Sequence, residues 1–265
     1  MVSSMRRWAR LAVAANIVFT VAWLLAATWQ GPNYSSFAHT ISDMYADGAP
    51  GAWVLITLFT LCGATVILFA WRSLWPALRE AGRPARIGTI LLALSIFGLG
   101  DLLSLFEQEG CRLADAGCTG ARQTGTFGGA MDATLSTIGV AALAVGGFFL
   151  AAAMKRIPAW QSWARPTLVA TVVYIVVFAL DGILGGSGAG GLLERLIALA
   201  GAAAITALAG GVLRRTRTDA IAPPRYDQSV RGNDLTAMRR QRPRPSEAPG
   251  SPGRTRRPDR RQPHC

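Results

Sequence analysis

The sequence predicts an all-α polytopic membrane protein: a bundle of six transmembrane helices with both termini cytoplasmic, followed by a disordered C-terminal tail. Three observations lead to this prediction. Of the 265 residues, 51% are hydrophobic and only 16% are charged. The chain contains six long apolar segments, and its basic residues fall in alternate connections between them. Such a composition lies outside the range of soluble domains, so it excludes a soluble enzyme or a soluble DNA-binding domain.

Six segments reach the roughly 20 apolar residues that a helix needs to cross about 30 Å of hydrocarbon. They are residues 11–29, 52–71, 87–106, 131–152, 167–184 and 192–213. All 14 prolines fall in the connections or in the tail, where a residue that cannot continue a helix is tolerated. We therefore expect one membrane domain over residues 1–213 and a separate tail over residues 214–265.

The basic residues indicate the orientation, because Lys and Arg are retained on the cytoplasmic side during insertion. The N-terminal segment, the second and fourth connections and the tail hold 24 of the 27 basic residues. The other connections hold only Arg112, Arg122 and Arg195, so both termini are expected in the cytoplasm. Of the 27 basic residues, 26 are Arg, a bias typical of GC-rich bacterial genomes. We expect a multi-pass protein of the bacterial plasma (inner) membrane.

Two cysteines lie in the same predicted external connection. Cys111 and Cys118 have six residues between them, and the oxidising environment outside the cytoplasm permits a bridge. The alternative, a pair of metal ligands, lacks a second pair of Cys or His nearby. We expect a disulfide that fixes the connection between the third and fourth spans.

Acidic residues gather on the side opposite to the basic ones. Of the ten acids in residues 1–213, only Glu80 lies on the predicted cytoplasmic side. The other nine lie in the outer connections or at the outer ends of spans: Asp43, Asp47, Asp101, Glu107, Glu109, Asp115, Asp132, Asp181 and Glu194. Because only three Arg accompany them, the outer mouth should attract cations or basic groups.

Three of these acids, Asp101, Asp132 and Asp181, lie within the ends of spans. A carboxylate at such a depth costs about 1–3 kcal/mol unless it is paired, protonated or facing water. We therefore expect the three to face a shared outer vestibule, beside residues of the first outer loop and the start of the sixth span. The candidate ligand-binding residues are His39, Ser42, Asp43, Asp101, Asp132, Asp181, Glu194 and Arg195.

Three interpretations of this set remain open. A His with two or three carboxylates could bind a divalent cation, and a water bound to that metal would be a hydrolytic nucleophile. Ser42 could be a nucleophile with His39 as its base, although the sequence has no G-x-S-x-G elbow. In the third interpretation the role is structural, and the aspartates of the third and fourth spans pair with Arg195 or Arg112.

The function that this pattern favours is binding of a small solute, a cation or a lipid headgroup at the acidic outer vestibule, in transport or sensing. A membrane-embedded, metal-dependent lipid hydrolase is one alternative, and a structural membrane subunit is another. Transport is disfavoured because no predicted span is broken by proline and no acid lies at mid-membrane. No cofactor is identified, although the carboxylates could hold a divalent cation.

Short motifs in matching topological positions resemble a bacterial membrane family known as domain of unknown function 998. They are Tyr34 to Pro50 (YSSFAHTISDMYADGAP), the Cys- and Asp-containing stretch before the fourth span, and Leu192 to Leu196 (LLERL), which is similar to a Gln-Arg signature. The resemblance covers roughly residues 11–215 and implies six spans. Many members carry a His near the start of the fourth span, where this chain has Asp132. The family looks distantly similar to six-span eukaryotic proteins of the Frag/Dram/Sfk type and has no agreed activity.

The tail, residues 214–265, holds 14 Arg and 8 Pro and has a net charge of +9. Such a segment buries too little apolar surface to fold, and it should lie against anionic lipid headgroups. Its arginines lack interleaved aromatic residues, so specific binding of nucleic acid is not expected. Small residues in the fourth and sixth spans favour close packing of helices, either within the bundle or across a homodimer.

Overall fold

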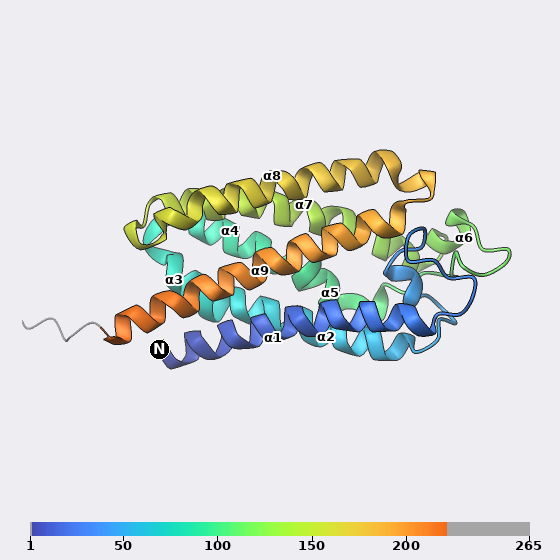
Figure 1. The fold of residues 1–265 in the computed structure, drawn as a ribbon, viewed down its shortest axis with the longest axis horizontal. Helices are drawn as coiled ribbons and strands as arrows, with labels where there is room; N and C mark the ends of the chain where they lie inside the picture. The colour runs from blue at the N-terminus through green and yellow to red at the C-terminus, as the bar shows by residue number, and fades with distance from the viewer. Residues whose placement is uncertain (1, 222–265) are drawn as a thin grey trace, which may run out of the picture. The chain divides into compact units, whose positions relative to one another are not determined.

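The computed structural model describes residues 2–221, and this part of the chain consists of helices and connecting loops (Figure 1). Five helices are long and apolar enough to cross a membrane. They are α1 (Val2–Ala26), α2 (Ala52–Phe69), α7 (Phe127–Lys155), α8 (Gln161–Leu184) and α9 (Gly190–Ile221). A bent pair of helical pieces, Arg83–Ala93 and Ile96–Phe106, also passes the test when taken as one span. The described residues therefore form a membrane bundle of five or six spans.

The helices run alongside one another in two connected groups. α1 packs along both α2 and α9, while α7 packs along α8 and along α4 (Arg83–Ala93). Figure 1 places the start of α1 and the end of α9 at one end of the bundle. The basic second and fourth connections lie there too, and we call this the arginine end. The opposite end, formed by the connections 30–51, 107–126 and 185–189, is called the loop end.

The third apolar segment is broken. After α4 ends at Ala93, the chain bends by 42° and continues in three short helical turns: Ile96–Gly100, α5 (Asp101–Leu103) and Ser104–Phe106. Ser95, at the bend, is fully buried. Glycine is required at Gly98, because a Cβ there would lie 2.3 Å from the Ala93 carbonyl oxygen. The expectation of a continuous third helix is therefore wrong, and the break needs no proline.

The other helices extend past the apolar segments that predict them. α8 begins at Gln161, so Pro166 lies inside the helix and not in the preceding connection, as the sequence suggested. Its first turns are at the arginine end, where water can replace the backbone hydrogen bond that proline removes. α9 continues to Ile221, beyond the expected end of the membrane domain at Leu213. The rest of the predicted disordered tail, residues 222–265, lies outside the described residues.

Small residues allow close contacts inside the bundle. A Cβ on Gly201 of α9 would lie 2.1 Å from the ring of Phe97, and a Cβ on Gly147 of α7 would lie 2.1 Å from Oγ1 of Thr171 in α8. Phe97 also meets Phe19 of α1 edge-on, with 5.5 Å between ring centroids. These contacts explain part of the small-residue pattern without a second chain.

Candidate functional site

Arg195 of α9 holds the first loop of the loop end in place. Its Nη1 donates to the carbonyls of Ser36 (2.8 Å), His39 (2.7 Å) and Gly191 (2.8 Å), and its Nη2 donates to the Tyr34 hydroxyl. The loop also touches the start of α9 directly, since a Cβ on Gly191 would lie 2.2 Å from the His39 carbonyl oxygen. Arg195 is buried, and it is satisfied by carbonyl and hydroxyl oxygens.

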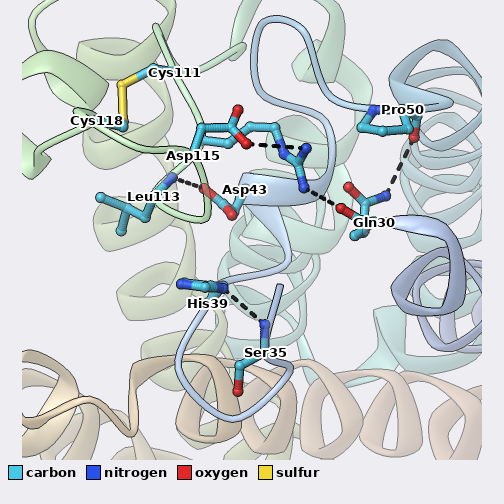
Figure 2. Close-up of polar contacts among 10 residues, drawn as sticks. Gln30, Ser35, His39, Asp43, Pro50, Cys111, Leu113, Asp115 and Cys118 are labelled. Carbon is cyan, nitrogen blue, oxygen red and sulfur yellow. Dashed lines mark hydrogen bonds and ion pairs between the residues drawn. A yellow bond between two sulfur atoms is a disulfide. The ribbon is translucent and has the colours of Figure 1, made fainter. Parts of the chain in front are cut away.

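A second buried arginine joins the first loop to the loop that follows the third segment, between Gln30 and Asp115, which are labelled in Figure 2. Arg112 donates from Nη2 to the carbonyl of Gln30 at 2.8 Å and lies 3.5 Å from the Asp115 carboxylate. The predicted disulfide between Cys111 and Cys118 is confirmed, with 5.9 Å between the two Cα atoms. The two loops of the loop end are therefore fixed to each other as well as to the helices.

Three candidate residues of the first loop make contacts that the sequence did not predict. Asp43 is fully buried and accepts a hydrogen bond from the backbone N–H of Leu113. In Figure 2 the His39 ring is turned toward Ser35, whose backbone N–H donates to Nδ1 at 3.0 Å. The Ser42 hydroxyl donates instead to the carboxyl of a glutamate in the second loop. The nucleophile and base pair of Ser42 and His39 is therefore not formed.

Four buried carboxyl groups lie beneath these loops. We call Asp101, Glu107, Glu109 and Asp132 the carboxyl cluster, and none of them is more than 8% exposed. Asp132 is in the second turn of α7 and Asp101 begins α5, whereas the two glutamates directly follow the broken segment. The Tyr45 hydroxyl lies within electrostatic range of Asp132 and both glutamates, and it donates a 3.3 Å hydrogen bond to Asp132 Oδ1.

The polar contacts of the carboxyl cluster are incomplete. Glu109 accepts hydrogen bonds from the Ser42 hydroxyl (3.1 Å) and from the side-chain amide of Gln123. Oε1 of Glu107, by contrast, is buried and has no hydrogen-bond partner among the described residues. In this part of the chain no basic side chain forms an ion pair with any of the four carboxyls. The predicted pairing of Arg195 or Arg112 with the aspartates of the third and fourth spans is not formed, because both guanidinium groups are bound to other oxygens.

Burial controls the protonation of the two glutamates. Removal from water, with a smaller effect from the Asp132 carboxylate, raises the pKa of Glu107 to about 8 and the pKa of Glu109 to about 9. Burial and the neighbouring carboxylates also raise the pKa of Tyr45 well above its ordinary value, so its hydroxyl remains a donor. Near neutral pH Glu107 and Glu109 are therefore protonated. Bound protons neutralise these two carboxyls, and no basic side chain among the described residues does so.

The other predicted acids lie at the edge of the carboxyl cluster or outside it. Glu194, at the start of α9, is partly buried and accepts from the backbone N–H of Ile41 at 2.6 Å. Asp181, near the end of α8, is partly exposed and its carboxylate lies beside Gly185 of the same chain segment. The structure therefore brings Asp101 and Asp132 into the cluster and leaves Asp181 outside it.

Sequence reasoning missed four residues of the site as candidates: Tyr45, Glu107, Glu109 and Gln123. The two glutamates belong to the predicted outer acids, but their position after the third apolar segment suggests exposure in a loop. The available signal was their place between that segment and the disulfide, which restricts how far the chain can extend from the bundle.

The described side chains do not form a metal centre. Among residues 2–221, no group of three or more His, Cys, Asp or Glu side chains is placed so that it could hold a metal ion. His39 is engaged by its own loop, and the four clustered carboxyls belong to three separate segments.

Comparison with known proteins gives one match. A sequence model of the family described as Protein of unknown function (DUF998) matches residues 11–211, which include most of every span and the whole loop end. No curated protein and no solved structure matches the chain. The expected family resemblance is confirmed over most of the chain, and the protein belongs to the DUF998 family.

Proposed function

We propose that the chain is a multi-pass protein of the bacterial plasma membrane that binds an ammonium-bearing ligand at the carboxyl cluster, with the loop end outside. The ammonium could belong to a free amine or to a lipid headgroup such as that of phosphatidylethanolamine. One observation carries this proposal: among residues 2–221, four carboxyls are buried together without a basic partner, and one of them, Glu107, has an oxygen without a hydrogen-bond partner.

The chemistry of an ammonium group matches these carboxyls. It supplies a positive charge and three donors, and charge-assisted hydrogen bonds to carboxylates are among the strongest that proteins form. A carboxyl buried without a partner is costly, so a cation that reaches Glu107 relieves that cost and replaces the bound protons. A divalent metal would need three or more converging ligands, which the described residues do not provide.

The orientation rests on the distribution of charge. The arginine end holds the basic second and fourth connections, while the loop end holds the disulfide and the acidic residues. Ser187→Cys at the loop end and Ser4→Cys at the arginine end test it, each in a chain carrying Cys265→Ser. A membrane-impermeant maleimide should label intact cells only through position 187. Labelling through position 4 alone would reverse the orientation.

The binding experiment is calorimetric titration of the full chain in mild detergent with ethanolamine. We expect Glu107→Gln to weaken binding about tenfold to a hundredfold, the effect of losing one hydrogen bond to a charged group. Glu80→Gln is the matched control, since Glu80 is exposed at the arginine end. Equal binding by all three proteins would refute the proposal.

The same chain in lipid nanodiscs distinguishes the two sources of the ammonium. If the ligand is a headgroup, phosphatidylethanolamine should compete with ethanolamine and phosphatidylcholine should not, because a quaternary ammonium has no N–H donor. If neither lipid competes, the ligand is a free amine.

Transport of the same cation is a second candidate, and the broken third segment favours it. Transporters place ion and substrate sites at discontinuous helices, and here the second half of the broken segment leads through Asp101 to the carboxyl cluster. Uptake of radiolabelled methylamine into proteoliposomes tests this candidate. Binding without uptake would favour a sensing role.

A further inference from the structure

A cavity of about 400 Å³ lies between α7, α8 and α9, on the side of the carboxyl cluster that faces the arginine end. This volume is within the range of small-molecule sites, roughly 300–1,000 Å³. Its walls are apolar, and small residues form two of them: Ala200, Ala203, Ala204 and Ala207 on α9, with Gly146 and Gly147 on α7. No residue of the carboxyl cluster lines this cavity.

The cavity results from the way α8 packs beside the small residues of α9. The alanines of α9 are spaced so that they share one helix face, and a face of small residues normally lets two helices approach closely. α8 packs against both helices: on α7, Gly147 leaves room for Thr171, and α9 meets Trp160, just before α8, at Gly211. The alanine face is left facing open space, and an unfilled apolar space forfeits the dispersion contacts of its lining.

The cavity is reached from the bilayer. Ala203 and Ala207 are exposed although they line it, and so is Val173 on the α8 side. Only 11% of the most apolar stretch of α8 is buried within the protein, so this helix is surrounded mainly by lipid. A membrane molecule can therefore enter sideways between α8 and α9 without crossing the loops.

Two arginines lie near one end of the cavity, and the rest of its lining is apolar. Trp163 lines the end nearest the arginine end, and the Arg214 guanidinium lies 5.8 Å from its ring centroid. Arg165, adjacent to the lining residue Pro166, is exposed at the same level. From there the lining runs along α8 to Tyr174, near the middle of the helix. An amphiphile with an anionic head and a hydrocarbon chain matches this polarity.

We propose that this cavity holds one acyl chain of an anionic phospholipid. The phosphate lies beside Trp163 and Arg214, at the arginine end, and the chain extends toward Tyr174. The lipid would fill the space that the alanine face leaves and would connect α8 to α9.

Native mass spectrometry of the delipidated full chain, with one phospholipid added back at a time, tests the proposal. Wild type should retain one dioleoyl phosphatidylglycerol in preference to dioleoyl phosphatidylcholine. Ala203→Phe should fill the cavity and lower phosphatidylglycerol occupancy about tenfold, and Ala207→Phe should do the same. Ala141→Phe is the matched control, because Ala141 is exposed on α7 and does not line the cavity.

A charge variant separates the headgroup from the chain. Arg214→Gln should bind both phospholipids and lose the preference for phosphatidylglycerol. Equal lipid retention by wild type and both phenylalanine variants would overturn the proposal, and so would retention of phosphatidylcholine equal to that of phosphatidylglycerol in wild type. Displacement of phosphatidylglycerol by equimolar oleate would identify a free fatty acid as the occupant and would also overturn it.

Discussion

The Tyr45 hydroxyl donates a buried hydrogen bond to the carboxylate of Asp132, with 3.3 Å between the two oxygens. This contact joins the first loop of the loop end to α7 across two residues that are far apart in the sequence. Because Tyr45 is fixed above the carboxyl cluster and cannot readily ionise there, it supplies a donor at all physiological pH values. The position of the loop and the charge of the cluster are therefore coupled through this side chain, as they are through the hydrogen bond from Ser42 to Glu109.

Tyr45→Phe should destabilise the protein, because it removes the donor and leaves a buried acceptor unpaired. The expected loss is about 1–3 kcal/mol, measured as the free energy of unfolding in mild detergent. The benzene ring keeps the edge-on contact with Phe59, where the centroids are 5.8 Å apart, so the packing is unchanged. An unfolding free energy equal to that of wild type would mean that the bond contributes nothing.

Tyr174→Phe should have the opposite outcome, with stability unchanged or slightly increased. The Tyr174 hydroxyl is also buried, but it has no hydrogen-bond partner among the described residues. Removing an unpaired polar group from an apolar site eliminates its desolvation cost without breaking a bond. Thermal unfolding of this variant beside Tyr45→Phe compares the same chemical change at a paired and an unpaired hydroxyl. A lower Tm for Tyr174→Phe would reveal a partner for this hydroxyl.

The stability of the protein should fall as pH rises from about 4.5 to about 9. The pKa values of Glu107 and Glu109, about 8 and about 9, are raised from an ordinary value of 4.5. Folding therefore favours the protonated forms, and their contribution is complete below about pH 4.5 and lost as pH passes through 8 and 9. Thermal unfolding at pH 5, 7 and 9 measures the slope.

Glu109→Gln should flatten this dependence, because the amide cannot ionise, and Glu80→Gln should leave it unchanged. A Tm that stays constant or rises between pH 5 and 9 in wild type would contradict the assignment. Ethanolamine should reduce the loss at high pH, because a bound cation favours the ionised carboxylates.

The sequence was sufficient for the features that depend on local composition. Apolar length predicts the long helices, and two close cysteines predict the disulfide that joins Cys111 to Cys118. Asp132 is a candidate from the sequence alone, because a charged residue within an apolar segment is unusual and easily recognised there.

The remaining features depend on how distant segments pack. In the sequence Glu107 has the features of an exposed loop acid. Its burial depends on how the segments of the loop end pack together. The bend at Ser95 depends on the close approach of the Gly98 backbone to the preceding turn, which hydropathy does not record. Arg195 could be placed at the mouth of a span, but its choice of carbonyl oxygens over carboxylates follows from the path of the first loop.

Arg195→Lys should loosen the first loop while leaving the bundle folded. A guanidinium group reaches several acceptors in fixed directions, whereas an ammonium on a flexible chain is a point charge that cannot hold them together. The backbone N–H groups of Gly191 and Leu192 donate to the carbonyls of Ala38 and Phe37, so their hydrogen exchange reports whether the loop remains docked. We expect about tenfold faster exchange at these two amides, equivalent to about 1.4 kcal/mol.

Arg122→Lys is the control for this change, because Arg122 is exposed and its side chain donates to one carbonyl, that of Gly117. Exchange at Gly191 and Leu192 should be the same in this control as in wild type. If Arg195→Lys also leaves it unchanged, the loop is held by its backbone contacts with α9 alone. If exchange increases and ethanolamine binding weakens as well, the docked loop is part of the ligand site, because it carries Tyr45 over the carboxyl cluster.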